Sequence, residues 1–283
     1  MVARHGTLAL ACGMAWLSLA CGDSAESSCP GNGVYPPAPS LNGFLTECAG
    51  AICVHYRPEL TVTQATVEAL ERQRLDLRET LAPVYWPGDD ARFDSFLYSS
   101  GPDKERAFPC RGQRATVVSL VDRHEAHHVL LSAHEMVHMY TFQEPDRAWS
   151  QLFNEGAAVY WGDDLAAQTP DLPPSDLNDY MPPERYLNSL PSGQMMSLAE
   201  VHAWEPNREL DRESRLLRYA TAGSFVHYLA EARGLDTLLA YLSGPGLAIE
   251  SPREPRLMDE LGRAYGSDLD SLEADWRAWV VTR

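Results

Sequence analysis

The sequence has very little lysine: Lys104 is the single one in a chain of 283 residues. Lysine and arginine together number 23 against 40 acidic residues, so the formal net charge is -17 at pH 7. A chain this acidic lacks the positive surface that binds phosphate backbones, so neither nucleic acid nor an anionic membrane surface is an expected partner. The sequence also lacks internal repeats, a phosphate-binding glycine loop and a Gly-x-Ser-x-Gly nucleophile elbow.

An apolar run long enough to cross a bilayer as a mature helix is missing as well. Residues 7–20 are apolar but too short, and they follow Arg4 and His5, a pattern typical of an export signal in residues 1–20. Leu-Ser-Leu-Ala-Cys at 17–21 resembles the cleavage box of bacterial lipoproteins, which implies a lipid anchor on Cys21. Ordinary secretion with cleavage nearby is the alternative. The expected location is the bacterial cell envelope, lipid-anchored or periplasmic, or otherwise the extracellular medium.

Residues 21–43 are rich in serine, glycine, proline and asparagine, and this composition predicts a flexible tether. The rest of the chain has enough apolar residues for one sizeable soluble domain, with 45% hydrophobic content in the sequence as a whole. A monomer is expected.

The cysteines favour disulfides. With Cys12 and Cys21 set aside, four of the six remain: Cys29, Cys48, Cys53 and Cys110. An even number in an exported chain predicts two disulfides with three possible connectivities. We favour a pairing of Cys53 with Cys110, which would join a strand to a later loop.

The most informative segment is Ala133-His134-Glu135-Met136-Val137-His138, which has the spacing H-E-x-x-H. In a helix, residues four apart lie on one face, so His134 and His138 can direct two imidazoles at a single ion. Glu135 would lie beside them, where a carboxylate can accept a proton from a metal-bound water. The alternative is a pair of core or surface histidines.

A second H-E-x-x-H occurs upstream at His124, Glu125 and His128. It directly follows the apolar run 115–121 and has polar flanks, so we interpret it as the turn between a strand and a helix, with an acidic or histidine cap. The downstream motif is therefore the predicted metal site. Sixteen residues lie between His138 and Glu155 of the segment Asn-Glu-Gly at 154–156, which makes Glu155 a candidate third ligand. The alternative is a solvated carboxylate at the start of a helix. Gly156 would allow the helix of Glu155 to approach the helix of His134 and His138 closely.

These motifs resemble the gluzincin metallopeptidases, and more narrowly the bacterial peptidase MA-like proteins. The resemblance implies zinc held by His134, His138 and Glu155, with Glu135 as the general base. Residues 219–229, Tyr-Ala-Thr-Ala-Gly-Ser-Phe-Val-His-Tyr-Leu, resemble the family helix whose tyrosine stabilises the oxyanion, which implies that role for Tyr219.

The chain also departs from that family. It has no Gly-x-Met-Glu-Asn stretch ahead of the helix that carries His134 and His138, which argues against an aminopeptidase. The acid found four residues after the third ligand in thermolysin-like enzymes is replaced by Val159. A partner for the zinc histidines is expected; Asp163 and Asp164 are near in sequence, but neither can be assigned.

The predicted fold is α+β and zincin-like: a small mixed sheet with the active-site helix in residues 44–143, then a mostly helical subdomain in residues 144–283. Hydrophobic patterning predicts strands at 51–58, 93–98 and 115–121, the last a possible edge for pairing with an extended peptide. Residues 169–193, rich in proline, are predicted to be a long surface crossing. Trp276 and Trp279 are expected in the core. Predicted helices span 61–82, 149–166, 197–204, 213–233, 235–243, 257–265 and 269–281.

The function predicted from the sequence is that of an exported zinc metallopeptidase acting on a peptide or protein. The alternative is a catalytically silent zincin-fold lipoprotein that serves as a binding module in the cell envelope. Silent relatives usually lose a ligand or the base, whereas His134, Glu135, His138 and Glu155 are all present here.

Overall fold

The computed structural model describes residues 41–84, 92–107, 117–119, 123–127, 132–141, 150–163, 182–191, 193–203, 211–243 and 256–283. The predicted signal, Cys21, Cys29, Cys110 and Asp164 lie outside these ranges, as does most of the predicted tether. Within them, no helix is long and apolar enough to cross a membrane.

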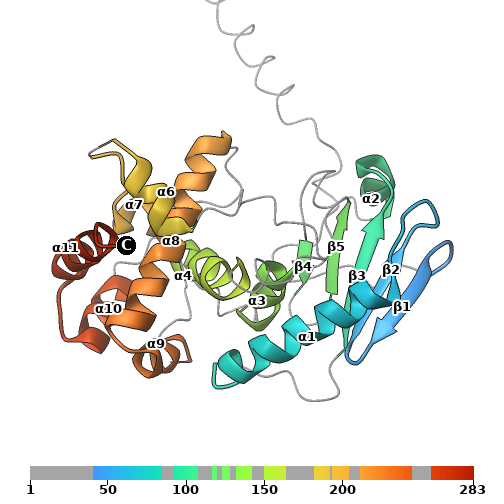
Figure 1. Ribbon diagram of the computed structural model, residues 1–283, viewed down its shortest axis with the longest axis horizontal. Coiled ribbons are helices and arrows are strands. Elements are labelled where there is room, and N and C mark those ends of the chain that lie inside the picture. The colour runs from blue at the N-terminus through green and yellow to red at the C-terminus, as the bar shows by residue number, and fades with distance from the viewer. Residues whose placement is uncertain are drawn as a thin grey trace, which may run out of the picture.

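The predicted α+β class with a small mixed sheet is confirmed (Figure 1). The sheet has the order β1-β2-β3-β5-β4. Its β2–β3 and β3–β5 pairs are parallel, and its β1–β2 and β4–β5 pairs are antiparallel. The strands are β1 (Leu45–Ala49), β2 (Ile52–Tyr56), β3 (Phe93–Tyr98), β4 (Val117–Ser119) and β5 (Arg123–His127).

Two strands differ from the prediction. β1 was not expected, because Leu-Thr-Glu-Cys-Ala contains no apolar run and much of it is exposed at the sheet edge. β5 contains His124 and Glu125, so our interpretation of that segment as a turn entering a helix is wrong. Parallel pairing with β3, in which His124 lies opposite Ser95, makes it a strand instead.

The prediction of a Cys53–Cys110 disulfide is also wrong, because Cys53 is bonded to Cys48. The reason is the β1–β2 hairpin, in which Cys48 and Cys53 are direct cross-strand partners with a Cα–Cα distance of 4.2 Å. The hairpin depends on β1, which the sequence pattern did not reveal.

One long helix, α1 (Gln64–Leu81), packs against the hairpin and against the metal-site helix. The Thr63 side chain caps it by accepting a hydrogen bond from the Thr66 amide at 3.2 Å. The apolar positions that predicted this helix are all buried: Val67, Leu70, Leu77 and Leu81. The Tyr140 hydroxyl donates to the carbonyl of Arg74 at 3.3 Å, which attaches the metal-site helix to α1.

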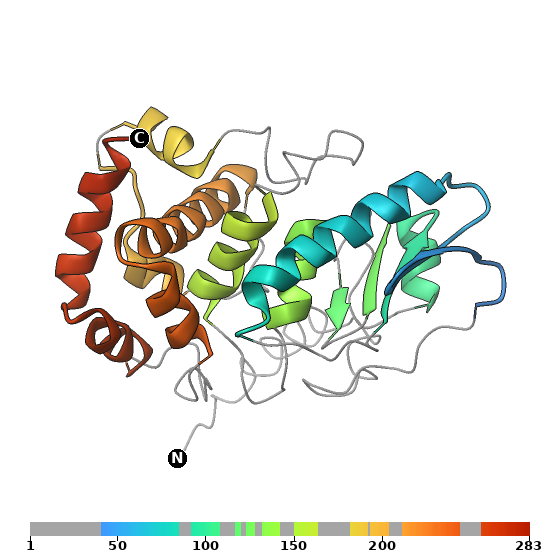
Figure 2. The ribbon, with the colours of Figure 1, turned by 60° about the horizontal axis from the view of Figure 1, so that its bottom comes forward.

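The described chain after β5 is helical. α3 (Ala133–Thr141) and α4 (Gln151–Ala157) come first, and the later helices lie on the opposite side of this pair from the sheet (Figures 1 and 2). The predicted helices are found within a few residues of their expected bounds, except that the helix predicted at 149–166 is an α-helix followed by a π-helix over its described residues. These elements are α3 (Ala133–Thr141), α4 (Gln151–Ala157), η3 (Ala158–Asp163), α7 (Leu198–His202), α8 (Arg212–Ala232), α9 (Leu235–Leu242), α10 (Arg256–Tyr265) and α11 (Leu269–Val280).

Two short helices were not predicted. α2 (Gly101–Ala107) follows β3, and α6 (Pro183–Ser189) lies within the segment expected to be a surface crossing. α6 packs on α8 and begins with Pro183, a residue that suits the first turn of a helix. Trp276 is a core residue as expected, with its indole donating to Ser224 Oγ at 3.1 Å, while Trp279 is partly buried.

Candidate metal centre

The two predicted imidazole ligands project from the first turns of α3. Ser132 begins this helix: its carbonyl accepts from the Met136 amide at 2.9 Å and its hydroxyl from the Glu135 amide at 3.3 Å. Because His134 and His138 are one turn apart, their rings lie together, with centroids 4.9 Å apart. Both side chains are buried, at 3% and 6% exposure, so the pair lies inside the protein.

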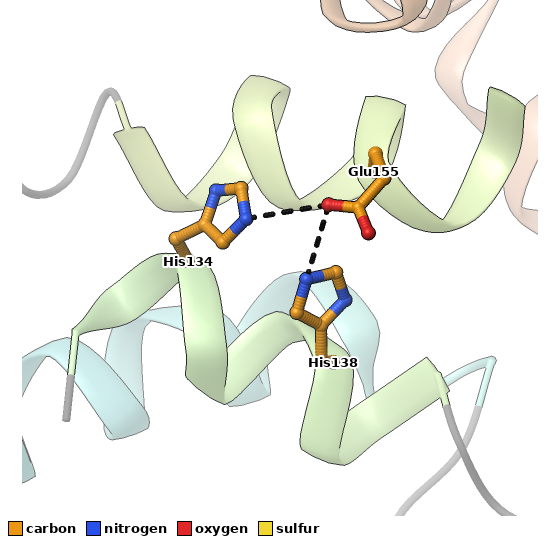
Figure 3. Close-up of side chains that lie close together, drawn as sticks. All are labelled: His134, His138 and Glu155. Atoms are coloured by element: carbon orange, nitrogen blue, oxygen red, sulfur yellow. Dashed lines mark ion pairs between the residues drawn. The ribbon is translucent and has the colours of Figure 1, made fainter. Parts of the chain in front are cut away.

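Glu155 on α4 meets this pair. Its Oε2 lies 3.5 Å from His134 Nε2 and 3.3 Å from His138 Nε2. Figure 3 shows both rings turned from α3 toward the carboxylate on the neighbouring helix. One ligand atom from each of the three residues lies within 4.8 Å of the others, so this buried group could hold a metal ion.

The geometry fits a small divalent ion. Ligands at ~2.0–2.1 Å from a tetrahedral ion lie about 3.4 Å from one another, close to the distances from Glu155 to the histidines. The Glu155 Oε2 atom is buried and has no hydrogen-bond donor among the described residues, which is the condition expected of an oxygen that binds a metal ion. Burial by itself raises the pKa of Glu155. The two histidines lower it by more than burial raises it, so its pKa is well below the ordinary value and the carboxyl stays ionised.

Asn154 was missed by the sequence analysis. Its Oδ1 lies 3.1 Å from Nδ1 of His138 in a fully buried contact. A carboxamide oxygen only accepts, so His138 Nδ1 carries the hydrogen and Nε2 is left with the lone pair that a metal needs. The position of Asn154 directly before Glu155 was visible in the sequence. The sequence did not indicate that the Asn154 side chain contacts His138. The side chain of Asp163 lies outside the described residues, as does Asp164.

The close approach of the two ligand-bearing segments depends on a glycine, though not on the predicted one. A Cβ at Gly162 would lie 2.4 Å from Cα of His134, whereas one at Gly156 would lie 2.6 Å from the carbonyl oxygen of Ala222. Gly156 therefore brings α4 against α8, and our assignment of it to the α3 contact is wrong. Gly162, on the π-helix, is the residue that lets this segment touch the backbone of α3.

The π-helix also accounts for Val159. Its side chain packs toward α8, where a Cβ at Gly223 would lie 2.3 Å from Val159 Cγ1. Position 159 therefore faces a helix contact that suits an apolar residue. A π-helix has a wider turn than an α-helix, so counting four residues on from Glu155 does not identify the next side chain on the metal-facing side.

Tyr219 lies beside His134 of the metal group, and Glu135 directly follows His134 on α3. The ring centroids of Tyr219 and His134 are 6.1 Å apart. Burial raises the pKa of Tyr219 well above 10, and the negative charges of Glu155 and Glu135 raise it further, so the hydroxyl remains a donor. Glu135 is half-buried on α3.

The other histidines considered from the sequence lie elsewhere. His124 is on β5, and His202 is buried on α7. His227 on α8 contacts two carboxylates, with Nδ1 3.1 Å from Glu184 and Nε2 3.1 Å from Glu231. The metal group defined by the described residues is His134, His138 and Glu155.

Comparison with protein-family models and with curated proteins finds no match for this chain. Its chemistry must therefore be argued from the site itself.

Proposed function

We propose that the protein is a zinc-dependent metallopeptidase of the gluzincin type, resembling the peptidase MA-like proteins. The observation that carries the proposal is the convergence of His134, His138 and Glu155, three buried ligands from two helices. Two imidazoles and a carboxylate form a known ligand set for catalytic zinc, which keeps a fourth position for water or substrate. Structural zinc sites usually take four protein ligands, whereas this group has three.

Bound zinc would supply Lewis acidity and lower the pKa of a coordinated water toward ~7. The chain's own groups would do the rest. His138 is oriented for metal binding by Asn154. Glu135 is the general base that accepts a proton from the attacking water and delivers it to the leaving amine. Tyr219, which remains protonated, donates a hydrogen bond to the oxyanion.

An extended peptide would bind along the sheet. β4 is the terminal strand of the described sheet and packs near α3, so we propose that the peptide pairs with its outer edge, beside the metal group. The sequence lacks the family element that binds a substrate amino terminus, so we propose cleavage that does not depend on a free amino terminus.

The proposed location is the cell envelope, with a lipid on Cys21 or with plain export. Mass analysis of the mature protein tests it: an acylated Cys21 supports the anchor, and an unmodified N-terminus elsewhere replaces it with secretion.

Metal analysis combined with cleavage of a mixed peptide library tests the proposed enzyme. The expected result is one zinc per chain, with cleavage that a chelator abolishes and added zinc restores. The matched variant is Glu135→Gln, which keeps the ligands and removes the base. One zinc per chain with no cleavage of any peptide would reject the peptidase and favour a silent binding module.

A further inference from the structure

A second cluster of chemically capable side chains lies on the sheet, where His55 is held between neighbours on both adjacent strands. His55 Nδ1 is 2.8 Å from Thr46 Oγ1 on β1, and His55 Nε2 is 2.9 Å from Asp94 Oδ1 on β3. The imidazole is 4% exposed and stacks on Phe96 with ring centroids 4.7 Å apart. The ring orientation is therefore determined by three contacts.

The direction of the two hydrogen bonds follows from their chemistry. The Asp94 carboxylate only accepts, so the neutral imidazole carries its hydrogen on Nε2 and donates it to Asp94. Nδ1 is then an acceptor, and the hydroxyl of Thr46 donates to it. A hydroxyl whose proton points at an imidazole nitrogen, with a carboxylate on the other ring nitrogen, has the geometry of an activated nucleophile.

The backbone around Thr46 is equally suited to an incoming group. β1 is the terminal strand of the sheet, so one of its edges has no partner strand among the described residues. The Cα–Cα distance of 4.2 Å between Cys48 and Cys53 is that of a pair without mutual backbone hydrogen bonds. Thr46 and His55 are two residues further along the ladder and form the same kind of pair. The Thr46 amide therefore points outward from the open edge, and Thr46 as a whole residue is exposed.

We propose that Thr46, His55 and Asp94 form a nucleophilic site that is independent of the metal centre and accepts acyl groups from activated carboxylic esters. Thr46 Oγ attacks the ester carbonyl while its proton passes to His55 Nδ1, and Asp94 stabilises the imidazolium that results. The outward amide of Thr46 donates to the oxyanion. The carbon–oxygen bond to the leaving group breaks, that oxygen takes the proton from His55, and the acyl group remains as an ester on Thr46.

The location separates this site from the metal group. β1 lies at the end of the sheet away from α3 and α4 in both ribbon views (Figures 1 and 2). Phe93, Leu97, Ile52, Val54 and Tyr56 point into the core, whereas Asp94 and His55 alternate with them and face the other side of the sheet. The proposal therefore stands or falls without the proposed peptidase.

The test is reaction of the full mature chain with p-nitrophenyl acetate in the presence of a chelator, followed by peptide mapping. One acetyl group on Thr46 is expected, with release of one p-nitrophenolate per chain in the first phase. Thr46→Ala should abolish this phase, and Thr46→Ser should restore it. His55→Gln should slow it by about a hundredfold, and Asp94→Asn by at least about tenfold.

Thr61→Ala is the matched control, because Thr61 is another exposed threonine and makes no contact with an imidazole among the described residues, and it should react like the wild type. An acetyl group found at other residues, or labelling of Thr46 that is unchanged in both His55→Gln and Asp94→Asn, would overturn the proposal. Since His55→Gln removes a buried ring, its Cys48–Cys53 disulfide and thermal unfolding are measured in parallel. If that variant does not fold, labelling of Thr46 in Asp94→Asn decides the test, because the Asp94 side chain is 37% exposed and its replacement disturbs the core less.

Discussion

Two segments ten residues apart have the same H-E-x-x-H spacing but different structures. Residues 134–138 lie in α3, where one helical turn places both imidazoles on the same face. Residues 124–127 lie in β5, where four residues span about 13 Å and neighbouring side chains alternate between faces. The comparison teaches that this spacing brings two imidazoles together when it lies in a helix, and that the group could hold a metal ion because Glu155 approaches the same helix.

Replacing ligands should give the largest difference in zinc binding between the two segments. His134→Ala, His138→Ala and Glu155→Ala should each lower zinc affinity by more than about a hundredfold, because each removes one of three ligands. His124→Ala is the matched control in β5 and should bind zinc as the wild type does. Competition with a chromophoric chelator measures the affinities. Zinc loss in the His124 variant, with retention in the α3 variants, would mean that the wrong segment had been chosen.

The two glutamates extend the comparison to catalysis. Glu135→Gln should lower kcat by about a thousandfold with zinc content unchanged, because the base is lost while the ligands remain. Glu125→Gln, the equivalent change in β5, should have little effect on kcat. Both are measured with the best peptide from the library. Near-normal turnover by Glu135→Gln would remove that residue from the mechanism.

Tyr219→Phe tests whether Tyr219 takes part in the chemistry at α3 or only packs beside His134. Loss of a hydroxyl that donates to the oxyanion should lower kcat by about a hundredfold, with KM and zinc content little changed. If Tyr219 only packs, kcat should stay near the wild-type value while stability falls by about 1 kcal/mol. Steady-state kinetics and thermal unfolding of the same preparation separate the two results.

Asn154→Ala should give the smallest fold-change of the four predictions. It removes the acceptor for His138 Nδ1, so zinc affinity should fall by about tenfold while Glu155 and both imidazoles remain. Asn154→Asp, which keeps an acceptor at that position, should restore most of the affinity. Equal affinities for the wild type and Asn154→Ala would show that this contact does not orient the ligand.

Local signals predicted the helices well. Val67, Leu70, Leu77 and Leu81 are apolar at helical spacing and all lie on the buried side of α1. β3 was predicted at its observed bounds from its run of apolar residues. β1 was missed and β5 was misinterpreted, because both have polar sequences and exist through hydrogen bonds to neighbouring strands. Strand propensity depends more on neighbours than helix propensity does.

The sequence by itself determined the components of the metal group: two histidines one helical turn apart, a glutamate between them, and a third ligand within reach of a second helix. Only the tertiary structure decided how they meet. It placed Gly162 against the backbone of His134, Gly156 against α8, and Asn154 against His138, and it paired Cys48 with Cys53 through an unpredicted hairpin. The physical reason is that spacing along one helix follows from its own periodicity, whereas contacts between elements depend on how closely two backbones can pack.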